Sequence, residues 1–205
     1  MLVPRRLVAS LAIASIAAPP TRRAHSFDLA LDVTFRADVN DDSCSELIEA
    51  VGRRVAQRSA LLARLESKQD EPPPPIHLHV TSRGGSLLAG LRAYDYLSGV
   101  DELHTHVDGL VASAATLLTL AGTRRSMTAH SMMLVHQPRI YLEDDLKATD
   151  LRDQAINMKK LVAHLLDVYT TKTRLGADDL LLMISNEQMM TASEALEYGF
   201  VTHIE

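Results

Sequence analysis

The sequence predicts a single-domain α/β fold. Beyond residue 30, short apolar strands alternate with amphipathic helices, which is the pattern of layered domains in which helices pack on a sheet. The chain has 205 residues, of which 46% are hydrophobic and 23% charged, so it can bury one sizeable core. We therefore expect residues 28–205 to form one domain.

The first strand is expected at residues 31–35, where polar and apolar residues alternate. A helix should follow, because Ser43 and Glu46 have the spacing of a capping box. Its apolar residues recur on one face: Leu47, Ile48, Val51 and Val55. The proline run at residues 71–75 cannot continue a helix and predicts an extended surface connector.

Two further strand and helix pairs follow the prolines. The strand at 76–80 leads into Ser-Arg-Gly-Gly-Ser at 82–86, and a helix is expected from 87 to 97. The next strand covers Leu103 to Val107, Asp108-Gly109 is expected to turn, and an apolar helix should start near Ser113. The rest of the chain predicts these elements: a strand at 131–135, helices at 146–173, 178–185 and 191–198, and a strand at 200–204.

Residues 1–27 have the composition of a targeting segment. No acidic residue precedes Asp28, four arginines are present, and residues 7–18 are apolar. This run is too short to span a bilayer as a helix, so no membrane association is expected. We expect import into an organelle, a plastid or a mitochondrion. The alternatives are a secretory signal and a disordered N-terminus. A disordered N-terminus would leave the protein in the cytoplasm.

The overall charge argues against nucleic acid as a partner. The formal net charge is −5 and the isoelectric point is near 6.0, whereas phosphate binding needs a basic face. One cysteine, Cys44, is present, so no disulfide can form within the chain.

Ser113 is the candidate nucleophile. It lies in a run of small residues, upstream of His136 and downstream of the glycine pair at 84–85. A serine hydroxyl needs a base to take its proton, and the oxyanion that forms on attack needs fixed N–H donors. Taken alone, a serine at a helix start is more often a cap or a small packing residue. The three segments together predict a hydrolase site.

Two histidine pairs offer a competing metal chemistry. His77 with His79 and His104 with His106 each have the spacing that places two rings on one face of a strand. A stable zinc site needs three or four ligands, and no cysteine or acidic cluster accompanies either pair. We therefore expect no metal site, and interpret the four as half-exposed strand residues.

Five segments resemble the proteolytic subunit of the Clp protease. Residues 82–86 resemble its Ser-Pro-Gly-Gly loop, 112–114 its nucleophile turn and 136–138 its histidine motif. Residues 192–199 match the x-x-Glu-Ala-x-x-Tyr-Gly part of its closing Ser-x-x-Glu-Ala-x-x-Tyr-Gly stretch, and 33–41, including Val39-Asn40-Asp41, resemble its entry strand and turn. The four motifs at 82–86, 112–114, 136–138 and 192–199 stand in the right order, which is far more specific than one motif, and the likeness covers about residues 31–205.

The resemblance implies a fold of repeated β-β-α units, the Clp and crotonase type. It implies a serine endopeptidase that hydrolyses unfolded polypeptides through an acyl-enzyme and serves protein quality control, without a cofactor. Its partners would be protein or peptide substrates, sibling subunits in two stacked seven-membered rings, and an ATP-dependent unfoldase. By motif, Ser113 is the nucleophile, His136 the general base, and the N–H groups of Gly85 and Ala114 form the oxyanion hole.

The third triad member departs from the family pattern. Counting back from Tyr198-Gly199, the aspartate position of the family falls on Glu187, and Asp179 is the alternative if the register differs. A glutamate can orient a histidine, but its extra methylene moves the carboxylate. Arg83 also replaces the proline of the glycine loop.

These departures leave two alternative functions open. A subunit that keeps the fold with a weakened triad would be a non-catalytic, structural member of the ring. An acyl-CoA hydratase or isomerase of the crotonase type would share the fold and its oxyanion hole of two N–H groups, but would not need the serine and histidine motifs.

Overall fold

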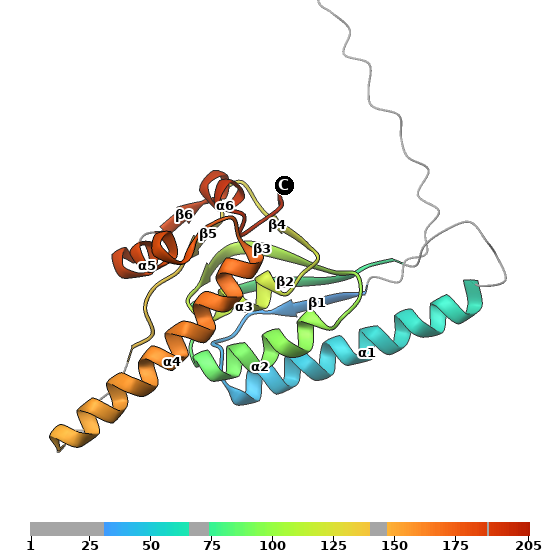
Figure 1. Cartoon of the computed structure of the whole chain (residues 1–205). Coiled ribbons are helices and arrows are strands. Elements are labelled where there is room, and N and C mark those ends of the chain that lie inside the picture. The colour runs from blue at the N-terminus through green and yellow to red at the C-terminus, as the bar shows by residue number, and fades with distance from the viewer. Residues whose placement is uncertain (1–30, 66–73, 140–146, 188) are drawn as a thin grey trace, which may run out of the picture.

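The computed structural model describes residues 31–65, 74–139, 147–187 and 189–205 (Figure 1). Its helices are α1 Asp41–Leu65, α2 Leu87–Ser98, α3 Ala115–Leu120, α4 Ala148–Lys172, α5 Ala177–Asn186 and α6 Ala192–Tyr198. Its strands are β1 Asp32–Phe35, β2 Ile76–Ser82, β3 Leu103–Ala112, β4 Arg124–Met127, β5 Met132–Leu134, β6 Met189–Thr191 and β7 His203–Ile204.

One mostly parallel sheet organises the chain, which confirms the predicted α/β class. Its strands follow the order β1-β2-β3-β4-β7, and all of these neighbours are parallel. Strand β5 pairs in parallel with the end of β3, and β6 pairs antiparallel with β5. The first half of β3 therefore contacts β4, whereas its end contacts β5. This divergence places the residues after β3 and β5 close together.

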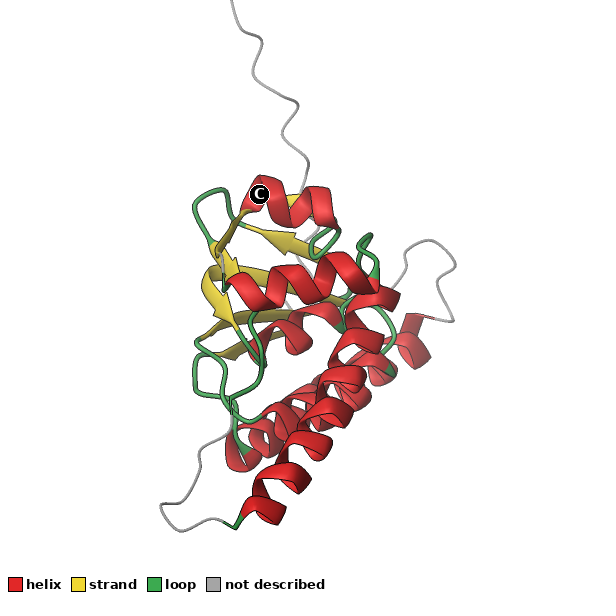
Figure 2. Cartoon of the chain, turned by 60° about the vertical axis from the view of Figure 1, so that its left-hand side comes forward, coloured by secondary structure: helices red, strands yellow, loops and turns green. Residues whose placement is uncertain are grey.

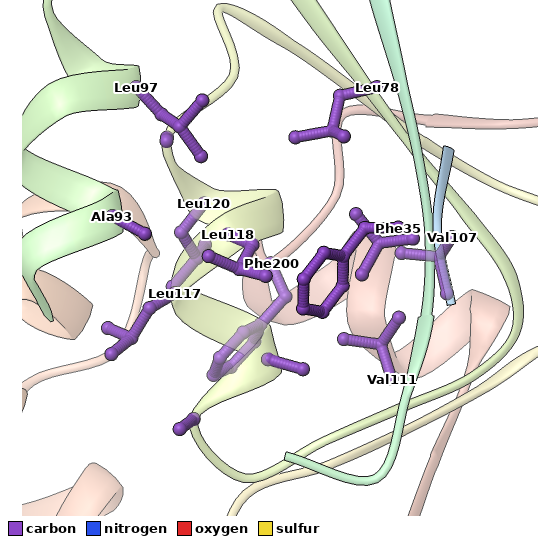
Figure 3. Close-up of a cluster of buried hydrophobic side chains, with 14 of the residues drawn as sticks. Phe35, Leu78, Ala93, Leu97, Val107, Val111, Leu117, Leu118, Leu120 and Phe200 are labelled. Carbon is purple, nitrogen blue, oxygen red and sulfur yellow. The ribbon is translucent and has the colours of Figure 1, made fainter. Parts of the chain in front are cut away.

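The core lies between the sheet and helices α2 and α3 (Figure 3). Along β2, Ile76, Leu78 and Val80 are fully buried, as the alternating pattern predicted. All six residues of α3 are buried. Burying one aliphatic side chain stabilises a fold by roughly 1.5–3 kcal/mol, so this layer contributes strongly to the stability of the fold.

Helix α1 begins two residues before the predicted capping box. Asn40 caps it: its Oδ1 accepts from the N–H of Ser43 at 2.9 Å, and Ser43 Oγ accepts from the N–H of Asn40 at 3.0 Å. The prediction of a Ser43 and Glu46 box was wrong, because asparagine is a preferred cap and Ser43 answers it from the third helical position. The predicted box at Thr191 and Glu194 is confirmed at the start of α6.

The predicted turn at Asp108-Gly109 is also wrong, because β3 continues through both residues. Val80 pairs with Val107 but Ser82 pairs with Val111, so β3 holds two extra residues in a bulge. Gly109 has φ +93°, a conformation that glycine adopts at low cost. Strand β4 was not predicted, since its Arg-Arg-Ser-Met sequence lacks an apolar alternation.

Helix α4 projects from the body of the domain at its N-terminal end (Figures 1 and 2). The prediction of a helix over 146–173 is confirmed to within two residues at the start and one at the end. Leu151 and Ile156, in this projecting half, are 46% and 43% exposed.

None of the helices in the described part of the chain combines the length and apolarity needed to cross a membrane. Residues 1–27, for which a targeting role was predicted, and prolines 72–73 lie outside the described residues.

The four predicted strand histidines form one cluster on the sheet face opposite the core. His77 and His79 lie directly beside His104 and His106 in the register of β2 and β3. His77 Nδ1 is 2.8 Å from His106 Nε2, and the rings of His79 and His106 are stacked at 4.5 Å. His79 Nδ1 also lies 2.7 Å from Asp108 Oδ2. His106 is the most buried of the four, at 8% exposure, so half-exposure was wrong for that residue.

This cluster predicts a loss of stability in acid. Burial lowers the pKa of His104 and His106, neighbouring imidazoles lower it further, and Glu102 and Glu205 oppose the shift. Arg124 also faces His104, and Asp108 faces His106. With a depressed folded-state pKa, the unfolded chain binds more protons as the pH falls below about 6.5. The stabilisation is therefore complete above that pH and is lost below it.

We expect the urea concentration at the midpoint of unfolding to decrease when the pH is lowered from 7.5 to 5.5. The decrease should be smaller in His106→Gln than in the wild type. His164→Gln is the matched control, because this exposed histidine of α4 is outside the cluster. An equal pH dependence in His106→Gln and the wild type would contradict the cluster as the cause.

Candidate active site

Ser113 occupies a strained turn between β3 and α3. Its φ is +55°, a left-handed conformation that is rare for residues other than glycine, asparagine and aspartate. Its N–H donates to Leu134 O of β5 at 2.8 Å, and Thr116 Oγ1 donates to its carbonyl at 2.7 Å. A sharp turn from strand to helix is how hydrolases present a nucleophilic serine. The structure thus gives Ser113 the backbone geometry of a nucleophile.

A buried hydroxyl pair fixes this turn to α4. Thr116 Oγ1 and Tyr169 OH are 2.7 Å apart, and both side chains are almost completely buried. Burial raises the pKa of Tyr169 to about 12, so the phenol stays protonated. Sequence reasoning missed this contact, which joins residues 53 positions apart.

The glycine loop is hydrogen bonded to Val39, and the N–H group of Gly85 takes no part in these hydrogen bonds. Val39 N–H donates to Gly84 O at 2.8 Å, and Ser86 N–H donates to Val39 O at 2.7 Å. Both bonds involve the neighbours of Gly85, so its own N–H faces away from Val39. Gly84 and Gly85 have φ +96° and +148°, which a side chain would strain. The loop therefore has the geometry of an oxyanion-hole donor.

His136 lies just after β5, and the next residue, Gln137, is hydrogen bonded to helix α5. Gln137 N–H donates to Ile184 O of α5 at 3.0 Å. The Nδ1 atom of His136 is buried, and Glu187 Oε1 is 3.5 Å from it. This distance is longer than a well-formed hydrogen bond, and catalytic hydrogen bonds often tighten only when substrate binds.

Glu187 is held by an arginine that sequence reasoning missed. Arg139 Nη2 is 3.2 Å from each carboxylate oxygen of Glu187, which caps α5 with φ +49°. Hydrogen bonds and charge from Arg139 lower the pKa of Glu187, with a smaller contribution from His136. The carboxylate is therefore ionised at neutral pH and faces both Arg139 and His136. The alternative, Asp179, lies in the first turn of α5 and makes no ion pair or hydrogen bond with His136 among the described residues.

Four of the predicted site residues line one cavity of about 500 Å³: Gly85, Ser113, Ala114 and His136. Glu187 does not line it, and contacts His136 through Nδ1 instead. The cavity wall is largely apolar, with Leu88, Met158, Leu161 and Leu165 as its aliphatic part. Across the described ranges, no group of three or more histidine, cysteine or acidic residues is arranged to hold a metal ion.

We expect Glu187→Gln to lower turnover by at least about tenfold and by up to about ten-thousandfold, the loss known for the amide variant of a well-formed triad, because an amide no longer offsets the positive charge of the imidazolium. Asp179→Asn should change turnover by less than about twofold, since this residue makes no hydrogen bond or ion pair with the imidazole among the described residues. Steady-state kinetics on a peptide substrate measure both. The reverse ranking would show that the third residue is Asp179.

The region of the chain that is similar to known proteins contains the whole candidate site. A family model described as Clp protease matches residues 38–205. The chain is 36% identical over 168 residues to the ATP-dependent Clp protease proteolytic subunit 1 of Leifsonia xyli subsp. xyli, covering 78% of this chain and 79% of the relative. It is 34% identical over 137 residues to the ATP-dependent Clp protease proteolytic subunit 1 of Chlamydia pneumoniae, covering 65% of this chain and 72% of the relative. The matched region includes the glycine loop, the serine turn, the histidine and Glu187.

Proposed function

Because the chain belongs to the Clp protease family, we propose that it is a serine-type endopeptidase subunit that hydrolyses unfolded polypeptides. The observation that carries this proposal is the strained Ser113 turn, which shares one cavity with His136 and the glycine loop. The match to the Clp family does not favour the alternative of a crotonase-type acyl-CoA enzyme.

In the proposed reaction, neutral His136 takes the proton of Ser113 as its Oγ attacks the scissile carbonyl carbon. The N–H groups of Gly85 and Ala114 donate hydrogen bonds to the oxyanion. The imidazolium then gives its proton to the leaving amine, which releases one peptide and leaves an acyl ester on Ser113. Water, activated by His136, hydrolyses the ester. Glu187 stabilises the imidazolium through its charge.

The proposal extends to the assembly. We infer stacked seven-membered rings of this chain or of sibling subunits, fed by an ATP-dependent unfoldase. The names of the relatives, ATP-dependent Clp protease proteolytic subunits, support a subunit that works within an ATP-dependent complex. We also propose import into an organelle, on the arginine-containing, acid-free composition of residues 1–27.

The test combines native mass measurement with hydrolysis of fluorescently labelled casein, an unfolded protein. We expect a multimeric particle that releases peptides from casein, faster with a Clp unfoldase and ATP present. A particle of the same mass that cleaves neither casein nor a short peptide would contradict the enzyme and identify a non-catalytic ring subunit. Hydration or isomerisation of an enoyl-CoA, without cleavage of peptides, would restore the crotonase-type alternative.

A further inference from the structure

The permanently charged side chains that line the active-site cavity are both arginines. Arg83 and Arg139 line it, and none of its described lining residues carries a carboxylate. Arginine remains protonated at every working pH, so these charges are permanent. A site lined in this way attracts negative charge from a bound polypeptide.

Arg83 is anchored at the cavity by its backbone. Its neighbour Ser82 donates from Oγ to Ala37 O at 2.6 Å and accepts from the N–H of Gly84 at 3.1 Å. The loop position of Arg83 is therefore fixed, two residues before the proposed oxyanion donor Gly85. Its side chain is exposed and makes no hydrogen bond or ion pair with other described residues. Its planar fork of N–H donors is thus free to bind a carboxylate in a bidentate manner.

Arg139 contributes less of its charge to a ligand. It is paired with Glu187, and that single carboxylate is shared with His136. Arg139 remains 64% exposed, so it adds to the positive field beside His136 while it keeps Glu187 in place. Of the two arginines, Arg83 is the one that can take a substrate carboxylate without breaking an ion pair.

The aliphatic wall complements this cationic rim. Leu88, 63% exposed, and Leu161 lie on α2 and α4 and face the same cavity. An apolar substrate side chain that covers them removes their surface from water. The cavity therefore presents an apolar wall and a positively charged rim to one stretch of polypeptide.

We propose that the site selects polypeptide segments with an acidic side chain beside the scissile bond, bound by Arg83, next to an apolar residue against the wall of Leu88 and Leu161. This selection rests on the proposed endopeptidase function and names its substrate class. An aspartate or glutamate carboxylate would pair with the guanidinium, whereas a lysine at the same position would be repelled.

The experiment uses internally quenched peptides of one sequence, with Asp, Asn or Lys placed in turn at each position flanking the cleaved bond. We expect kcat/KM at one position to be about threefold to fivefold higher for Asp than for Asn at low ionic strength, with Lys below Asn. The preference should shrink in 0.5 M NaCl, because salt screens exposed charges.

Two variants assign the preference to Arg83. Arg83→Gln should bring the ratio of kcat/KM for the Asp and Asn peptides close to one. Arg53→Gln, which removes an exposed arginine of α1 outside this cavity, should leave the ratio unchanged. If Arg83→Gln does not fold, the peptide and salt series on the unmodified protein still test whether the site prefers an acidic side chain.

Equal kcat/KM for Asp, Asn and Lys at every position would overturn the selection and leave the endopeptidase intact. So would an Asp preference that persists in Arg83→Gln. Failure to cleave any of the peptides, together with no labelling of Ser113 by a fluorophosphonate, would contradict the proposed function itself and the selection with it.

Discussion

Replacing Ser113 by alanine is expected to lower peptide hydrolysis by at least about a thousandfold, since a triad nucleophile contributes to catalysis as part of a unit. The loss is chemical, because the acyl-enzyme route needs the hydroxyl oxygen. The fold should survive, since alanine removes one oxygen atom from a half-buried side chain. Steady-state kinetics and the urea midpoint measure the two effects separately.

Ser98→Ala is the matched control for that substitution. Ser98 ends α2 and does not line the cavity, so its loss should change kcat/KM by less than about twofold. Unchanged hydrolysis by purified Ser113→Ala would show that another group attacks the substrate or that a contaminating peptidase is being measured.

Replacing Gly85 by alanine should cost about a hundredfold to a thousandfold in kcat, the range found when one oxyanion-hole donor is lost. A Cβ atom at Gly85 would lie 2.2 Å from Val39 O, at φ +148°. Backbone atoms cannot yield as a flexible side chain does, so the loop has to move. The N–H that faces the substrate oxyanion would move with it.

Gly99→Ala is the control for the glycine substitution. The nearest heavy atom to an added Cβ there is Tyr96 O at 3.5 Å, an ordinary contact, and φ is −86°. We expect its kinetics to match the unmodified protein. A Gly85→Ala variant that folds and keeps full kcat would contradict the assignment of Gly85 to the oxyanion hole.

The elements that the sequence predicted well are those with a local signal. Strand β2 buries every second residue, and the Thr191 and Glu194 box caps α6, because each pattern depends on neighbours in the sequence. Strand β4 and the bulge at Gly109 were missed, since their positions follow from pairing with β3 and β2 rather than from local composition. Asn40 was a recognisable cap that the Ser43 spacing concealed.

The features of the active site divide in the same way, into those with a local sequence signal and those that depend on the folded chain. Motif order predicted Ser113, His136 and Gly85, which the structure places around one cavity. No local pattern predicts the left-handed φ of Ser113, because serine has little preference for it. The contacts of Arg139 with Glu187 and of Thr116 with Tyr169 join residues 48 and 53 positions apart, and only the assembled fold brings them together. Glu187 was located by counting, and its 3.5 Å separation from His136 required coordinates.

In the proposed mechanism, His136 activates Ser113 for nucleophilic attack. Intact mass and peptide mapping after incubation with a fluorophosphonate test this activation, because this probe reacts with an activated serine. We predict one adduct on Ser113 in the unmodified protein and labelling slowed by at least about a hundredfold in His136→Ala, the lower range for a general base. No adduct on Ser113, or equal labelling rates in the two proteins, would contradict the claim.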